Sequence, residues 1–296
     1  MKISFTKNEI ILHITVLIWG FTGILGALIS VSAVNLVWYR VLIASVALII
    51  YFKLKGKTLR VSKQQLLQYL TTGGLVGLHW LLFFQSIKVS TVSVTLVCLS
   101  SLTLFTSILE PIIKKQRMAP IDLISGIVII IGIGLIFTIE SSYILGITLG
   151  LSCALIASLF SIINSNLVKK NDATTISFYE MVGAFFWLSI YILLFEKIDN
   201  GFFLDTADLI YLMLLGTVCT AAAYVAGEAV MRELSAFKVA LVTNLEPIYG
   251  IILAWLFFGQ KEVMSWGFYL GAVIILGTVF LYPYFIRLIA KRKLAK

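Results

Sequence analysis

Residues 235–250 read Ser235-Ala-Phe-Lys-Val-Ala-Leu-Val-Thr-Asn-Leu-Glu-Pro-Ile-Tyr-Gly250, and an apolar run continues to Phe258. This stretch is long enough to cross a bilayer, yet it carries a carboxyl group, Glu246, and a proline, Pro247, near its middle. A charged side chain at that depth is costly and marks a functional site by default. Pro247 has no N–H to donate to the carbonyl of Thr243, so a backbone acceptor is left beside the carboxyl group. The stretch therefore predicts a polar site inside the membrane.

The composition indicates an integral membrane protein. The chain of 296 residues is 60% hydrophobic and 12% charged, with a mean hydropathy of +1.04. A helix of about 20 apolar residues, at about 1.5 Å rise per residue, crosses about 30 Å of hydrocarbon. The sequence predicts an all-α fold with ten such helices and short loops: 9–29, 34–52, 65–86, 90–113, 120–139, 144–168, 174–195, 206–230, 235–258 and 265–286.

The positive charge is distributed along the chain as in a membrane protein. The net charge is +9, and with a cytoplasmic N-terminus 19 of the 23 lysines and arginines fall on the cytoplasmic side of the ten helices. This is the positive-inside bias. It predicts a multi-pass protein of the inner or plasma membrane with both termini in the cytoplasm. Because no basic folded domain is present, nucleic acid is excluded as a partner.

The two halves of the sequence resemble each other at an offset of 145 residues. Gly126 and Gly132 match Gly271 and Gly277, and Ser90 matches Ser235. The sequence therefore predicts two five-helix repeats, 1–142 and 143–296, the second with a basic tail. Since five is odd, the second repeat enters the membrane from the opposite side. Inverted repeats of this kind are a transporter design, with the substrate site where the repeats meet.

Several motifs carry a family resemblance. They are Gly216-Thr217, the run from Ala229 to Ala236, Asn244-Leu245-Glu246-Pro247, and Leu253 to Gly259, together with His79-Trp80 and the following turn to Ser93. These resemble the EamA family of the drug/metabolite transporter superfamily. The resemblance implies ten helices, cytoplasmic termini, a central cavity walled by helices one to four and six to nine, and export of amino acids or similar metabolites. Leu102 and Gln260 depart from the family pattern, which often has proline and glutamate there.

Charged and polar residues within the predicted helices are the candidate substrate-binding or coupling residues. Glu246, with Asn244 beside it, is either a titrating group in the cavity or a packed, neutral carboxyl. Arg40 either extends to the outer face or binds a substrate carboxylate from the cavity wall. Glu180 lies about 12 Å from Arg40 along the membrane normal, too far for a direct ion pair in a ~30 Å core. His79 either binds substrate or a proton, or is a packed neutral histidine.

Aromatic side chains complete the set of candidates. Trp80, Tyr39, Tyr224 and Tyr249 are placed either to line the cavity or to pack and anchor the helices at the interface. Two further carboxylates precede a cation by four residues, in the pairs Glu110–Lys114 and Glu228–Arg232. That spacing is typical of ion pairs at the end of a helix.

No catalytic, phosphate-binding or metal-binding motif is found in the sequence, so neither a cofactor nor a metal is expected. The sequence predicts a secondary active exporter of small polar metabolites, with amino acids as the leading class and protons as a candidate coupling ion. Its predicted partners are the small-molecule substrate and the lipid bilayer, and the sequence does not indicate an oligomeric state. The alternatives are a lipid-modifying membrane enzyme, which requires a polar cluster at one membrane surface, and a passive channel, which requires a continuous pore.

Overall fold

The protein is all-helical in a computed structural model that describes residues 6–115, 120–139, 141–196 and 202–294. Over these ranges it contains helices and connections but no strands. The α-helices are α1 (Lys7–Leu28), α2 (Ala33–Leu54), α3 (Lys63–Val89), α4 (Val92–Leu99), α5 (Leu102–Ile113), α6 (Pro120–Ile139), α7 (Ile144–Leu167), α8 (Ala173–Phe195), α9 (Thr206–Leu214), α10 (Ala223–Val230), α11 (Ala236–Thr243), α12 (Leu245–Phe258) and α13 (Trp266–Leu294). A π-helix, η3 (Leu215–Ala222), joins α9 to α10, and short 3-10 turns, η1 (Ser141–Tyr143) and η4 (Gly259–Glu262), precede α7 and follow α12.

Eight helical runs in the described chain are long and apolar enough to cross a membrane. They are α1, α2, α3, α4 with α5, α7, α8, α9 through α10, and α11 through η4. The apolar parts of α6 and α13 are shorter, 124–136 and 266–282. The all-α membrane fold is thus confirmed, whereas ten crossings stay a prediction.

Short polar side chains begin most of these helices by accepting the first free backbone N–H groups. Thr6 and Glu9 form a capping box on α1, and Ser62 and Gln65 form one on α3. Asp172 caps α8 and Ser235 caps α11 in the same manner. The helix ends of this apolar chain are therefore set by local sequence.

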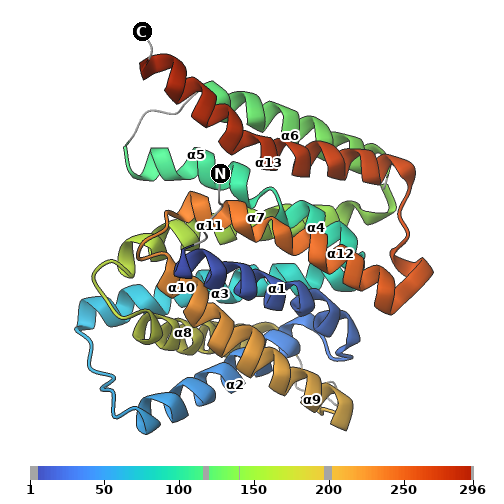
Figure 1. Cartoon of the computed structure of the whole chain (residues 1–296). Coiled ribbons are helices and arrows are strands. Elements are labelled where there is room, and N and C mark those ends of the chain that lie inside the picture. The colour runs from blue at the N-terminus through green and yellow to red at the C-terminus, as the bar shows by residue number, and fades with distance from the viewer. Residues whose placement is uncertain (1–5, 116–119, 140, 197–201, 295–296) are drawn as a thin grey trace.

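The helices lie side by side in an array, with α6 and α13 paired along one edge of it (Figure 1). In the rest of the array α3 packs against both α7 and α8, and α1 packs against α12. The α3–α8 crossing is close because small residues meet there. A Cβ built on Gly73 would lie 2.9 Å from the Cα and the carbonyl carbon of Glu180, and one on Gly183 would lie 2.5 Å from the carbonyl oxygen of Leu70. Small residues of this kind let membrane helices approach backbone to backbone.

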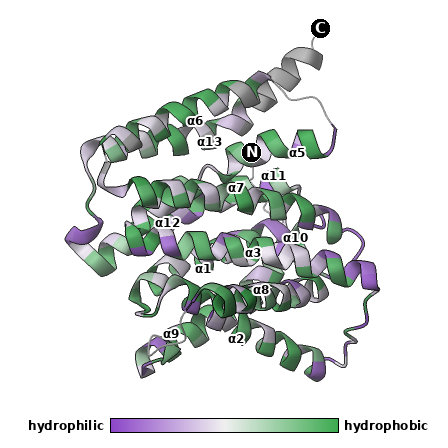
Figure 2. Ribbon diagram, turned by 180° about the vertical axis from the view of Figure 1, so that it is seen from behind, coloured by the Kyte–Doolittle hydropathy of each residue, from purple (hydrophilic) through white to green (hydrophobic). Residues whose placement is uncertain are grey.

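Polar contacts tie the connections together at the two ends of the array. At one end Lys57 pairs with Asp172 at 3.4 Å, and Lys238 pairs with Glu9 at 2.7 Å. At the other end Asp208 accepts from Ser30, and Glu262 accepts from the N–H groups of Val92 and Ser93. Hydrophilic residues gather at both ends and apolar residues fill the middle of the helices (Figure 2). The described chain begins and ends at the same end of the array (Figure 1).

Three helical paths are interrupted near their middles. Ser100 and Ser101 separate α4 from α5, and Asn244 separates α11 from α12 two residues before Glu246. Pro247 explains the second break, since proline leaves the preceding turn without a hydrogen bond. The third path widens into η3, where the Thr220 hydroxyl donates to the carbonyl of Leu215 at 2.6 Å. Non-helical backbone at membrane depth is tolerated where it is buried in protein or lines a cavity.

Candidate functional site: a polar cavity between the helices

A cavity of about 100 Å³ lies among the interrupted helices. On the scale of 10–15 Å³ per water, this space holds several waters or a small solute. The residues that line it come from α1, α2, α3, α7, α10, α11 and the breaks at α4–α5 and α11–α12: Trp19, Thr22, Arg40, His79, Trp80, Phe83, Leu99, Leu102, Ala157, Phe160, Ser161, Tyr224, Gly227, Glu228, Met231, Val239, Ala240, Thr243 and Glu246. Both halves of the chain therefore contribute to its wall.

Arg40 on α2 is the one basic residue besides His79 in this lining, and it is only 1% exposed. Its Nε donates to the Thr220 hydroxyl of η3 at 2.6 Å, and its guanidinium lies 4.0 Å from the centroid of the Trp80 ring. The Nη1 atom has no hydrogen-bond partner among the residues that the structure describes. A cation stacked on an aromatic face in a desolvated site is held by about 2 kcal/mol. Arg40 is thus fixed in the wall with donor capacity left over, and it does not extend to the outer face.

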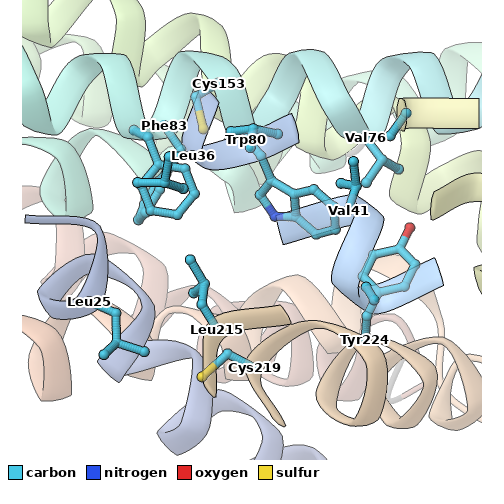
Figure 3. Close-up of a cluster of buried hydrophobic side chains, with 14 of the residues drawn as sticks. Leu25, Leu36, Val41, Val76, Trp80, Phe83, Cys153, Leu215, Cys219 and Tyr224 are labelled. Carbon is cyan, nitrogen blue, oxygen red and sulfur yellow. The ribbon is translucent and has the colours of Figure 1, made fainter. Parts of the chain in front are cut away.

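Trp80 and Tyr224 link the two halves of the chain across this site. Their rings, from α3 and α10, meet edge to face with centroids 5.7 Å apart (Figure 3). Trp80 is 7% exposed and Tyr224 is 6% exposed, so both are largely covered by protein. Both rings line the cavity, which is one of the two positions that the sequence left open for them.

His79 lies next to Trp80 on α3, one turn from Phe83. Its Nδ1 lies 3.1 Å from the carbonyl oxygen of Cys153 and 3.1 Å from its sulfur, and its ring contacts Phe160 edge to face. A ring nitrogen that faces a carbonyl carries the proton, so the Nδ1–H tautomer fits this contact. His79 is therefore half-buried in the cavity wall with one ring nitrogen already engaged.

Glu246 enters the cavity from the first turn of α12. It is 6% exposed and forms no side-chain hydrogen bond or ion pair with another described residue. It lies close enough to Arg40 for their charges to interact. The cavity thus contains a carboxyl group and a guanidinium that are near each other but not joined.

A second group of polar side chains borders the cavity in the C-terminal half. Asn164 of α7 donates through Nδ2 to Glu228 at 2.9 Å and to Glu180 at 3.2 Å. The hydroxyl of Tyr224 donates to the same Glu180 oxygen at 2.8 Å. Glu180 of α8 does not line the cavity. Its hydrogen bond to Tyr224, and the Asn164 bridge to Glu228, connect Glu180 to the cavity wall.

The predicted helix-end pair Glu228–Arg232 is wrong. Helix α10 ends at Val230, and Glu228 points into the protein with 2% exposure. Arg232 instead donates to the carbonyl groups of Val168 and Asn171 at 3.1 and 3.2 Å. The predicted Glu110–Lys114 pair does form.

Besides Glu180, three predicted site residues lie away from the cavity lining. Asn244 donates to the hydroxyl of Thr103 and to the carbonyl of Ala240, and so joins the two helix breaks. The hydroxyl of Tyr39 donates to the carbonyl of Phe202 at 2.7 Å, next to a cluster of aromatic rings. Tyr249 packs beside Gly20 of α1. These three positions support the helices around the site.

Sequence reasoning did not identify Asn164, Thr220 or Glu228 as site residues. Asn164 and Thr220 are polar residues inside apolar runs, which is a signal of function or buried pairing in a membrane helix. Glu228 lies one turn after Tyr224, so the two share a helix face. Among the described residues there is no group of three His, Cys, Asp or Glu side chains that would hold a metal ion.

An array of membrane-length helices around a partly charged internal cavity is the arrangement of a membrane transporter. The sequence agrees: residues 7–138 and 144–283 match the EamA-like transporter family. The chain belongs to this family, which is part of the drug/metabolite transporter superfamily.

Similar proteins are also named as transporters. An uncharacterized transporter of Archaeoglobus fulgidus is 23% identical over 285 residues, which covers 93% of this chain and 97% of that protein. The uncharacterized transporter YxxF of Bacillus subtilis is 23% identical over 258 residues, covering 84% and 81% of the two chains. A crystal structure with 15% identity superposes with a TM-score of 0.70, over 96% of this chain and all of the other, and so shares the fold.

Proposed function

We propose that this protein is a secondary active transporter that exports amino acids, or closely related small polar metabolites, by alternating access. The observation that carries the proposal is the placement of a guanidinium and a carboxyl group in the wall of one cavity. Arg40 has an unpaired donor, Glu246 has no bonded partner among the described residues, and the two face one small cavity without joining. A zwitterion satisfies both groups at once.

The Arg40 end of the cavity suits a carboxylate. A guanidinium binds a carboxylate through two parallel N–H bonds, and its planar shape fixes the direction of the ligand. Because Thr220 and Trp80 already hold Arg40 in place, little side-chain freedom is lost when a ligand binds. Glu246 at the edge of the α12 break then accepts from the ammonium group.

The packing of the helices supports two inverted five-helix repeats, with a boundary near residue 143. Exchanging the halves maps α1, α2, α3, α4–α5 and α6 onto α7, α8, α9–α10, α11–α12 and α13. Under this exchange α3 becomes the path from α9 through η3 to α10, and α8 becomes α2, so the α3–α8 contact corresponds to the α2–η3 contact. In the same way α7 becomes α1, so the α3–α7 contact corresponds to the α1–α10 contact. The α4–α5 and α11–α12 breaks correspond as well. Ten crossings and alternating access between two such halves are proposed on this basis.

The charge distribution supports an inner or plasma membrane protein with both termini in the cytoplasm. Lys57 and Arg232 in connections, and Lys238 in the first turn of α11, make polar contacts at one end of the helix array. Positive charge of this kind remains on the cytoplasmic side of a membrane.

The test is transport into inside-out vesicles that contain the protein, with an imposed pH gradient. Labelled amino acids are compared with the matching amines, which lack the carboxylate, and with the matching carboxylic acids, which lack the ammonium group. We expect uphill accumulation of the amino acids. Accumulation that stops at equal concentrations identifies a passive channel, and no transport of any of the three classes contradicts the proposed substrate.

Two variants assign the ends of the substrate. In Arg40→Gln we expect transport of carboxylate-bearing substrates to fall more than that of amines. In Glu246→Gln, which has nearly the same volume, we expect the preference for an ammonium group to disappear. If Glu246→Gln also loses transport driven by the pH gradient but keeps substrate exchange, Glu246 is a coupling residue. Equal losses for all substrates in both variants contradict the assignment.

A further inference from the structure

Two carboxyl groups in the C-terminal half of the protein share one amide. Asn164 Nδ2 donates to Oε1 of Glu228 at 2.9 Å and to Oε2 of Glu180 at 3.2 Å, so these two oxygens lie within two hydrogen-bond lengths of each other. Glu180 is fully buried and Glu228 is 2% exposed. Neither carboxyl forms an ion pair with a described lysine, arginine or histidine.

The other oxygen of each carboxyl has no hydrogen-bond partner among the described residues. Glu180 Oε1, Glu228 Oε2 and Asn164 Oδ1 are all buried without a hydrogen bond among the residues that the structure describes. An unsatisfied buried polar atom costs about 1–3 kcal/mol, and more if the group is charged. Two ionised carboxylates that accept from one amide in a low-dielectric interior repel each other. A bound proton removes one of the two charges.

The surroundings favour a proton over a metal cation. Asn164 directs an N–H group between the two carboxyls, and Tyr224 directs its O–H at Glu180 Oε2. Donors at the centre of a site repel a metal ion, which binds carbonyl and carboxylate oxygens. A proton needs only one of the free oxygens.

One side of the site is closed by helix packing, and another faces the cavity. The backbone of α8 at Glu180 packs directly on Gly73 of α3, which closes that side. Glu228, in contrast, lines the cavity. A proton on Glu228 can therefore leave for water in the cavity, which turns the carboxyl group into a carboxylate, and the reverse step restores it.

Other titratable groups lie near the pair or around the cavity. From α3 they are Tyr69, which interacts with Glu180 electrostatically and whose hydroxyl has no hydrogen bond among the described residues, and His79, which contacts Cys153 of α7. Arg40 of α2, Tyr224 of α10 and Glu246 of α12 line the cavity, and Cys219 of η3 lies near Arg40. Helix α1 faces α10 with Trp19 and Thr15, which do not titrate.

We propose that Glu180 and Glu228, bridged by Asn164, share one exchangeable proton that Glu228 presents to the substrate cavity. The pair is thus a proton-binding site separate from the Arg40 and Glu246 groups that contact substrate. Its use as the coupling site rests on the proposed transport by alternating access. Exposure of the cavity to each side in turn would then load the proton from one side and release it to the other.

The test is infrared difference spectroscopy on the full-length protein in liposomes, which needs no substrate. The C=O stretch of a protonated carboxyl is followed through pH steps in H2O and D2O. We expect such a band at neutral pH in the wild-type protein, with an isotope shift because Glu228 exchanges with water. Glu180→Gln and Glu228→Gln should each abolish or shift this one band, since the proton is shared. Glu246→Gln is the control in the same cavity: a band that only this variant removes belongs to Glu246, and the band that the two pair variants change should stay in place.

Three results overturn the proposal: no protonated carboxyl at neutral pH in the wild type, loss of the pair's band in Glu246→Gln, or a band removed by one of the pair variants and unchanged in the other. If the pair variants fail to fold, Tyr224→Phe tests the same point. It keeps the ring against Trp80 but removes the O–H that Glu180 accepts, so the band must change frequency. A shared proton without pH-driven transport of amino acids would contradict the proposed function and leave this site intact.

Discussion

Replacing Gly73 with alanine tests the close crossing of α3 and α8, on which the position of Glu180 depends. The new Cβ would clash with the carbonyl oxygen of Glu180 and lie 2.9 Å from its Cα and carbonyl carbon, whereas ordinary contacts begin at 3.4 Å. All three atoms belong to the backbone, so no side chain can rotate away. The helices must separate by about half an ångström or more, and overpacking of this kind costs about 1–3 kcal/mol.

Gly134→Ala is the matched control for this change. Gly134 lies inside α6 with no atom within 4 Å of a Cβ built on it. Alanine in place of glycine stabilises a helix interior by about 1 kcal/mol, and both variants share that gain. The difference between the two variants therefore isolates the cost of the clash.

The assay is the temperature at which the detergent-solubilised protein loses its monodisperse peak in size-exclusion chromatography. Because such unfolding is irreversible, the order of the variants is compared rather than an equilibrium free energy. We expect Gly73→Ala to fail at a lower temperature than the wild type, and Gly134→Ala to equal or exceed it. If Gly73→Ala is as stable as Gly134→Ala, the helices are not in backbone contact at this crossing and the argument is refuted.

Three further outcomes are expected. Thr220→Val leaves the buried Nε of Arg40 without an acceptor, which costs about 1–3 kcal/mol in the same stability assay; unchanged stability would mean that the hydroxyl does not hold Arg40. Partial burial favours a higher pKa for Asp172, but the Thr175 N–H and Lys57 outweigh it, so the pKa lies below its usual 3.8. The ionised Asp172 therefore stabilises the protein above pH 3.8, and this stabilisation is lost as the pH falls through the lowered pKa. Asp172→Asn should be less stable than the wild type at neutral pH, and the difference in stability should shrink in acid. A difference that does not change with pH would contradict this. A reporter fused after Lys296 should be active in the cytoplasm, and activity outside would contradict an even number of crossings.

The sequence determined the membrane fold, because apolar runs of membrane length and the polar caps between them are local features. It also predicted several residues that line the cavity. Glu246, Arg40, His79, Trp80 and Tyr224 were predicted and line the cavity, since polar and aromatic groups at membrane depth are rare enough to stand out.

The tertiary structure decided which of these residues meet. Glu228 has the spacing of a helix-end ion pair in the sequence, but the end of α10 at Val230 frees Arg232 to bind the α7–α8 connection. Glu228 is then left beside Asn164, 64 residues away in the chain. Whether a carboxyl group faces a cation, a lipid or a second carboxyl depends on how the helices cross. Those crossings are set by contacts such as Gly73 on Glu180, which a one-dimensional pattern does not contain.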